Sequence, residues 1–203
     1  MQSPSTPVRL TYRDLLALPD DLLRHELIDG EHIVSPAPGT QHQRIVLRLV
    51  LALGNHLKKH PRGELFVAPF DVLLSMHDMV EPDLLYVANW RRRRQLNDKR
   101  LVGPPDLAVE VLSPSTRTRD ETRKLRLYER FAVSEYWVID PIHETVRLYR
   151  LVKGSLALVD TLSRDTAARA RRLVTPLLPG LAIPLASLFT QRPSKGRSRD
   201  RQR

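Results

Sequence analysis

The clearest helical periodicity in the chain lies in residues 40–60. Apolar side chains recur there at steps of three and four, and they form a stripe made of Val46, Leu49, Val50, Leu53 and Leu57. His42 extends this stripe toward the beginning of the segment, and the Pro61-Arg62-Gly63 sequence that follows is typical of a helix end. The pattern predicts an amphipathic helix over residues 40–60 with its apolar face toward a core.

A second helical pattern covers residues 118–131. Its apolar stripe has the spacing i, i+3, i+4, i+7 and consists of Lys124, Leu127, Tyr128 and Phe131. Thr118, three residues before Glu121, predicts a capping box at the first turn. Shorter helices are expected over residues 11–18 and 185–189.

Apolar runs bounded by turn residues predict strands over residues 64–74, 79–87, 106–112, 134–139, 145–152 and 156–162. Residues 25–28 and 31–34 are expected to form a hairpin, because Asp29-Gly30 between them suits a two-residue turn. The polar, Arg-rich residues 89–105 are expected to be a loop with a short helical turn. Helices and strands do not alternate regularly, so we expect an α/β protein of the mixed α+β kind, with a central mixed sheet flanked by helices and an N-terminal β-hairpin.

Composition is consistent with one domain over residues 10–190, between a flexible N-terminal segment 1–9 and a disordered basic tail 191–203. The chain has no cysteine, which excludes disulfides, thiolate metal sites and cysteine nucleophiles. Neither a signal-peptide core nor an apolar run long enough for a membrane span occurs, so a cytoplasmic protein without membrane contact is expected.

The formal net charge of +10 favours a polyanionic partner, with nucleic acid first and DNA preferred. Arginine outnumbers lysine, so compositional bias is the alternative explanation. The run Arg91-Arg92-Arg93-Arg94 after Trp90 has two interpretations that the sequence leaves open, namely the border of a nucleic-acid groove and a solvated turn.

Two carboxylates interrupt apolar, strand-like runs. Asp83 lies in residues 80–87 and Glu110 in residues 105–112, and a carboxylate in a buried strand is costly unless something pairs with it. A divalent cation is one such partner. Glu110 shares a strand face with small Ala108, which leaves room for a ligand. The structural alternatives are an edge position for Glu110 and a strand-initiating, backbone-bonded role for Asp83.

Lys124 is the third candidate, because a lysine on the apolar stripe of a helix calls for a negative partner. Its alternative is a side chain that extends past the core to solvent. Glu26, just before the hairpin turn, either joins the same cluster or is an ordinary exposed acid. His42 and Gln43, at the start of the first long helix, are candidates for contact with substrate or a metal-bound water, and a purely structural His42 is the alternative.

Four segments together resemble the Uma2 family of the PD-(D/E)XK nuclease superfamily, and the similarity covers roughly residues 10–189. They are residues 25–31 (HELIDGE), 81–84 (EPDL), 105–116 (PDLAVEVLSPST) and 135–141 (EYWVIDP). The resemblance implies a restriction-endonuclease-like core with a four-stranded mixed sheet and a Mg²⁺-dependent cut of a phosphodiester bond. It also implies metal ligation by Asp83 and Glu110, with Glu26 as the acid that precedes them.

The superfamily lysine stands two residues after the acid, a position that is Leu112 here. The resemblance implies that Lys124 replaces it from the following helix. The hypothesis is therefore an endonuclease that uses Mg²⁺ or Mn²⁺, with Asp83, Glu110, Lys124 and Glu26 as catalytic residues and with a homodimer serving two strands. The alternatives are an inactive nuclease-like scaffold that still binds nucleic acid, and a hydrolase of small phosphodiesters or nucleotides.

Overall fold

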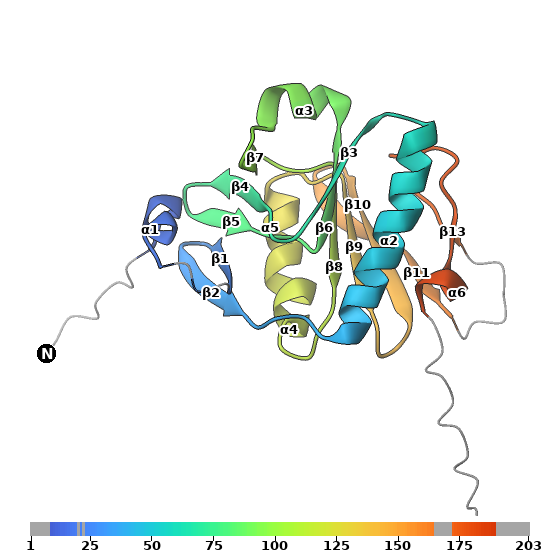
Figure 1. Cartoon of the computed structure of the whole chain (residues 1–203), viewed down its shortest axis with the longest axis horizontal. Coiled ribbons are helices and arrows are strands. Elements are labelled where there is room, and N and C mark those ends of the chain that lie inside the picture. The colour runs from blue at the N-terminus through green and yellow to red at the C-terminus, as the bar shows by residue number, and fades with distance from the viewer. Residues whose placement is uncertain (1–8, 20, 22, 165–171, 190–203) are drawn as a thin grey trace, which may run out of the picture.

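The computed structural model describes residues 9–19, 21, 23–164 and 172–189, and two β-sheets form its framework (Figure 1). Within these residues the larger sheet is mixed and has the strand order β11-β10-β9-β8-β6-β3. Its strands are β3 (Gly63–Val67), β6 (Leu84–Ala88), β8 (Leu107–Val111), β9 (Glu135–Asp140), β10 (Thr145–Val152) and β11 (Ser155–Ser163). The expected mixed sheet is confirmed, and in this part of the chain it has six strands rather than four.

The smaller sheet contains the predicted hairpin and has the order β2-β1-β5-β4-β7. Its strands are β1 (Arg24–Ile28), β2 (Glu31–Ser35), β4 (Asp71–Ser75), β5 (Asp78–Val80) and β7 (Arg100–Val102). Asp29 and Gly30 have positive φ values of 56° and 77°, which confirms the expected two-residue turn. A further short pair joins β12 (Arg172–Leu173) to β13 (Ile183–Pro184).

Strand β8 lies in the middle of the larger sheet, parallel to β9 and antiparallel to β6. Its alternate residues Leu107, Val109 and Val111 pack in one core cluster, together with Leu49 and Leu53 of α2 (Thr40–Lys59). Ala108 and Leu112 pack in the other cluster, on the opposite face. The predicted alternation along this strand and the predicted apolar face of the first long helix are both confirmed.

The second long helix follows the predicted course, but it begins earlier and is irregular. It runs as α4 (Arg117–Arg119), a π-helical segment η1 (Asp120–Lys124) and α5 (Leu125–Arg130). The capping box predicted for Thr118 is wrong, because the backbone N–H of Arg117 already donates to the carbonyl of Ser113 and places Thr118 inside the helix. Glu121, the other half of that box, instead pairs with Arg117 and Arg147.

Two predicted strands were too long. Residues 64–74 divide into β3 and β4, and residues 79–87 divide into β5 and β6, so that the halves belong to different sheets. Pro69 and Pro82 lie in the two breaks, and a proline has no N–H to continue a strand ladder. The second break leaves Asp83 immediately before β6, at the junction between the sheets.

The remaining predictions are mostly confirmed. Helix α1 (Tyr12–Leu16) begins at Thr11 with a capping box, and α6 (Leu185–Leu188) lies where a short last helix was expected. Residues 89–105 hold helix α3 (Asn89–Gln95) and also strand β7, which the pattern did not predict.

The basic tail predicted for residues 191–203 lies outside the described residues, as do residues 1–8 of the predicted flexible segment. Arg9 is described, and its Nε donates to the Asp29 carbonyl at 3.0 Å. In the part of the chain that the structure describes, no helix has the length and apolar character needed to cross a membrane.

Candidate active site

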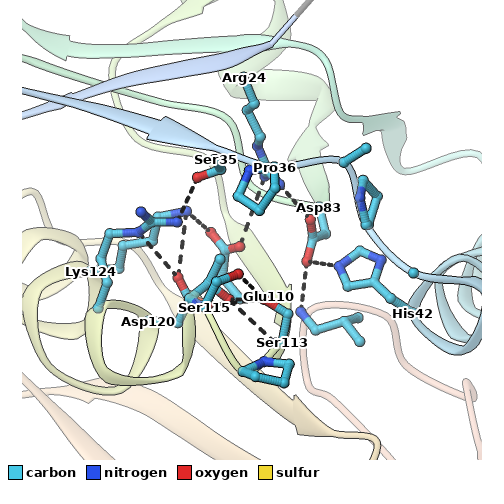
Figure 2. Close-up of a pocket in the computed structure, with 17 residues that line it drawn as sticks. Arg24, Ser35, Pro36, His42, Asp83, Glu110, Ser113, Ser115, Asp120 and Lys124 are labelled. Carbon is cyan, nitrogen blue, oxygen red and sulfur yellow. Dashed lines mark hydrogen bonds and ion pairs between the residues drawn. The ribbon is translucent and has the colours of Figure 1, made fainter.

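A cavity of about 200 Å³ lies beside the C-terminal end of β8, where the two sheets and two helices meet (Figure 2). We call it the acidic cavity, because Asp83, Glu110 and Asp120 line it together with Lys124. Strand β8, the break before β6 and the segment η1 supply these four residues. The cavity therefore depends on segments that are far apart in the sequence.

Asp83 is nearly buried and is held by three donors. Its Oδ2 accepts from the backbone N–H of Val111 at 2.7 Å and lies 2.9 Å from Nε2 of His42, while Oδ1 accepts from Nη1 of Arg24 at 2.9 Å. Burial acts to raise the pKa of Asp83, but the His42 hydrogen bond and the Arg24 charge lower it more, to about 2. Asp83 is thus an ionised carboxylate anchored to the strand that carries Glu110.

Glu110 extends from β8 toward the face of the sheet that η1 and α5 cover. Its Oε1 accepts from Nζ of Lys124 at 2.7 Å and from the Tyr128 hydroxyl at 3.0 Å. Its Oε2 makes no hydrogen bond to a described residue and lies 4.0 Å from Nη2 of Arg24. Burial raises the pKa of Glu110 to about 8, although Lys124 opposes this effect. One oxygen is therefore fixed, while the other is left for a ligand.

Lys124 is 1% exposed, which rules out the alternative of a lysine that extends to solvent. Besides Glu110, its Nζ contacts Oε1 of Glu26 at 2.8 Å. Burial acts to lower the pKa of Lys124, but the facing carboxylates raise it overall, so the ammonium is retained. Glu26 is fully buried, and its pKa lies below the ordinary value because Lys124 and Arg24 outweigh the effect of burial. The structure thus brings Glu26 into the cluster.

His42 and Gln43 have different positions. The His42 side chain is 10% exposed and bonded to Asp83, so it orients that carboxylate. Gln43 is exposed and lines a second, neighbouring cavity.

Sequence reasoning did not identify Arg24 or Asp120 as residues of the site. Arg24 stands two residues before Glu26 on the same face of β1, so strand alternation could have found it. Asp120 precedes Lys124 by four residues and is 2% exposed, and its Oδ1 lies 3.8 Å from the lysine Nζ. Spacing of i, i+4 on one helix was the available signal.

The donor set fits a hard cation only in part. Oε2 of Glu26 and Oδ1 of Asp120 are buried oxygens without a hydrogen-bond partner. Within the described residues, however, no three His, Cys, Asp or Glu side chains form a cluster able to hold a metal ion. Mg²⁺ is commonly held by one or two carboxylates, with water and substrate phosphate completing its shell, and Asp83 with Glu110 matches that pattern.

The Arg91–Arg94 run lies away from this cavity. Helix α3 follows the end of β6, and Nε of Arg91 pairs with Asp106, just before β8 begins, whereas Glu110 is near the end of β8 (Figure 1). Arg92 pairs with Glu64. The run therefore does not border the acidic cavity.

The larger sheet is mixed, and helices cover both of its faces (Figure 1). A crystal structure described as "a putative nuclease belonging to DUF820", from Anabaena variabilis, matches the protein with a TM-score of 0.71 and 22% identity, over 89% of this chain and 97% of that one. The chain belongs to the Uma2 family, whose model, described as "Putative restriction endonuclease", matches residues 12–186. No functionally curated protein matches significantly.

Proposed function

We propose that the protein is a Mg²⁺-dependent nuclease that hydrolyses phosphodiester bonds of nucleic acid, with DNA as the first substrate and Mn²⁺ as an effective substitute. The observation that carries the proposal is the meeting of Asp83, Glu110 and Lys124 from three separate segments at one buried cavity. Membership of the Uma2 family supports the same reaction class.

Asp83 and Glu110 would hold the cation, with Glu26 assisting through Lys124 rather than by direct contact. When bound, Mg²⁺ supplies charge neutralisation at the phosphate and a water that loses its proton more readily. Asp83 is suited to this role because its pKa of about 2 keeps it ionised. Glu110 offers one oxygen to the cation, because Lys124 and Tyr128 fix Oε1 while Oε2 makes no hydrogen bond to a described residue. Its pKa of about 8 in the absence of metal means that the cation would displace a proton from Glu110 on binding.

Lys124 is a positioning residue in this scheme. Its Nζ is buried and contacts both Glu26 and Glu110, so it fixes the orientation of Glu110 and opposes the rise in the Glu110 pKa that burial causes. Lys124 therefore contacts Glu110 from the helix, although the lysine of the superfamily pattern would stand at the position of Leu112 on the strand.

Arg24 supplies the phosphate-binding group. Its Nη1 donates to Asp83, while Nε and Nη2 are buried without a hydrogen-bond partner. A planar guanidinium with free donors beside two carboxylates suits an oxygen of a phosphate group. We extend the proposal to a homodimer, because two cavities would be needed to cut both strands of a duplex.

The test is cleavage of supercoiled plasmid in Mg²⁺, in Mn²⁺ and in EDTA. Wild type is expected to nick the plasmid only with metal, and Glu110→Gln and Asp83→Asn are expected to lose at least about 100-fold of the rate. Glu31→Gln, an exposed acid on the same hairpin, is the matched control and should cut normally.

The competing functions have distinct outcomes. Tight plasmid binding without cutting in either metal would support an inactive nuclease-like scaffold. Hydrolysis of small diesters without plasmid cutting would support a hydrolase of small phosphodiesters or nucleotides. Calorimetric titration with Mg²⁺ and Mn²⁺ on wild type and Glu110→Gln tests the proposed ligands without reference to activity.

A further inference from the structure

A second and larger cavity of about 530 Å³ adjoins the acidic cavity. We call it the apolar cavity, because much of its wall comes from Leu23, Pro36, Pro38, Val46 and Pro69. It shares four polar residues with the acidic cavity, namely Arg24, Ser35, His42 and Asp83. Its size falls within the range of small-molecule sites, roughly 300–1,000 Å³. The hydrolytic scheme above makes no use of it.

Glu81 and Arg24 line the apolar cavity, and their side chains form an ion pair that is too long for a hydrogen bond. Oε2 of Glu81 and Nε of Arg24 are both buried, and neither makes a hydrogen bond to a described residue. They lie 3.8 Å apart, and the Glu81 side chain is 9% exposed. Leaving such groups unsatisfied is costly, so the pair is suited to a ligand that offers a donor beside an acceptor.

We propose that the apolar cavity binds one nucleobase of the substrate strand, turned out of its stack. The Watson–Crick edge of every nucleobase carries a donor next to an acceptor, which complements Glu81 Oε2 and Arg24 Nε. Apolar side chains flank the flat faces of the base, as in other proteins that hold an extruded base. This inference rests on the proposed function and specifies its substrate as nucleic acid with an unpaired nucleotide.

Arg24 provides the connection between the two cavities. Its Nη1 and Nη2 face Asp83 and Glu110, whereas Nε faces Glu81. A phosphate in the acidic cavity and a base in the apolar cavity would thus meet two sides of one guanidinium. Gln43, on the first turns of α2, adds an amide to the wall. A purely apolar ligand would leave both Arg24 Nε and Glu81 unsatisfied, which favours a base.

A preference for unpaired nucleotides follows. A fully paired duplex must break stacking and pairing before a base can enter, whereas a single strand, a gap or a mismatch needs less disruption. We expect single-stranded oligonucleotide to bind about 10- to 100-fold more tightly than the matched blunt duplex.

The experiment measures binding in EDTA, so that hydrolysis plays no part. The probes are a single-stranded oligonucleotide carrying 2-aminopurine, its duplex, and a strand of the same length with abasic sites. Wild type should raise the 2-aminopurine fluorescence on binding the single strand and should bind the abasic strand at least tenfold more weakly.

Two variants locate the site. Glu81→Leu removes the acceptor, and Val46→Phe fills the cavity from α2, so each should weaken single-strand binding about tenfold and leave the weak abasic binding unchanged. Glu31→Leu, on the exposed hairpin edge, is the control and should bind as wild type. Thermal unfolding of each variant checks that it is folded. If Glu81→Leu does not fold, Val46→Phe alone provides the test.

The outcomes separate this inference from the proposed function. Equal affinity of wild type for intact and abasic strands overturns the base site, even if plasmid is cut. A base-dependent signal that is lost in Glu81→Leu and Val46→Phe supports the site, even if no metal promotes cutting.

Discussion

Replacing Lys124 with methionine should destabilise the protein in a pH-dependent way. The substitution keeps the length and helix propensity of the side chain and removes its charge. Lys124 Nζ lies 2.8 Å from Glu26 and 2.7 Å from Glu110, whose exposed fractions are 0% and 2%. Loss of the ammonium leaves these buried carboxylates without their nearest cation, and removal of one partner from a buried pair costs about 3–5 kcal/mol.

The pH dependence follows from Glu26. In wild type its pKa lies below the ordinary 4.5, because the cations outweigh burial. Without Lys124, burial dominates and the folded-state pKa rises above the unfolded value. An acid of that kind lowers stability as pH rises above its unfolded pKa, by about 1.4 kcal/mol per unit. The cost of Lys124→Met should therefore be larger at pH 7 than at pH 5, by at most about 3 kcal/mol over these two units.

Urea unfolding at pH 5 and pH 7, followed by tryptophan fluorescence, measures the difference, because Trp137 is fully buried. Lys58→Met, on the exposed face of α2, is the matched control and should stay within about 0.5 kcal/mol of wild type at both pH values. The double variant Lys124→Met with Glu26→Gln should recover part of the loss at pH 7.

A cost below about 1 kcal/mol at pH 7, or an equal cost at both pH values, would show that Lys124 does not hold the charge of these carboxylates. The same result would remove its assigned role in orienting Glu110.

Three further predictions concern stability. As pH falls from 4 to 2, the free energy of unfolding of wild type should decrease by about 2 kcal/mol relative to that of Asp83→Asn. The reason is that the pKa of Asp83 is about 2 in the folded protein, so its stabilising effect is complete only above the ordinary pKa of 3.8. Acid titration followed by circular dichroism tests this. Leu49→Ala should cost about 2–5 kcal/mol in urea unfolding, whereas Leu51→Ala, 55% exposed on the same helix, should cost under about 0.5 kcal/mol. Gly30→Ala should lower stability by about 1–2 kcal/mol, since φ is +77° and the new Cβ would lie 2.8 Å from the Cβ of Arg9; calorimetry that shows no change would contradict this.

Local patterns were sufficient to predict much of the fold and part of the candidate site. Strand alternation placed Glu110 on the face beside Ala108, and helical spacing placed Lys124 toward the core. The meeting of these two residues followed from burial, because each needed an opposite charge. The Asp29-Gly30 turn was also predicted from a local pattern, the two turn residues themselves.

The rest depends on contacts between distant segments. Nothing in residues 64–87 reveals which sheet each half joins, although Pro69 and Pro82 could have signalled the breaks. The π-helical η1 has no period distinct enough to separate it from an α-helix in so short a segment. Arg24 carried a local signal beside Glu26, but its position between Asp83 and Glu81 required the tertiary arrangement.

The hairpin that carries Arg24 and Glu26 belongs to the smaller sheet, where β1 joins β5 through the pairing of Leu27 with Met79. Asp83 and Glu110 belong to the other side of the junction, so the ion pairs of the site also fasten the hairpin to the main body. A partial opening that releases only this hairpin would dismantle the site and leave the principal core intact. Heat or mild denaturant should therefore abolish activity before the protein unfolds globally. Amide hydrogen exchange in β1 should increase under the conditions that abolish activity, before exchange increases in the principal core.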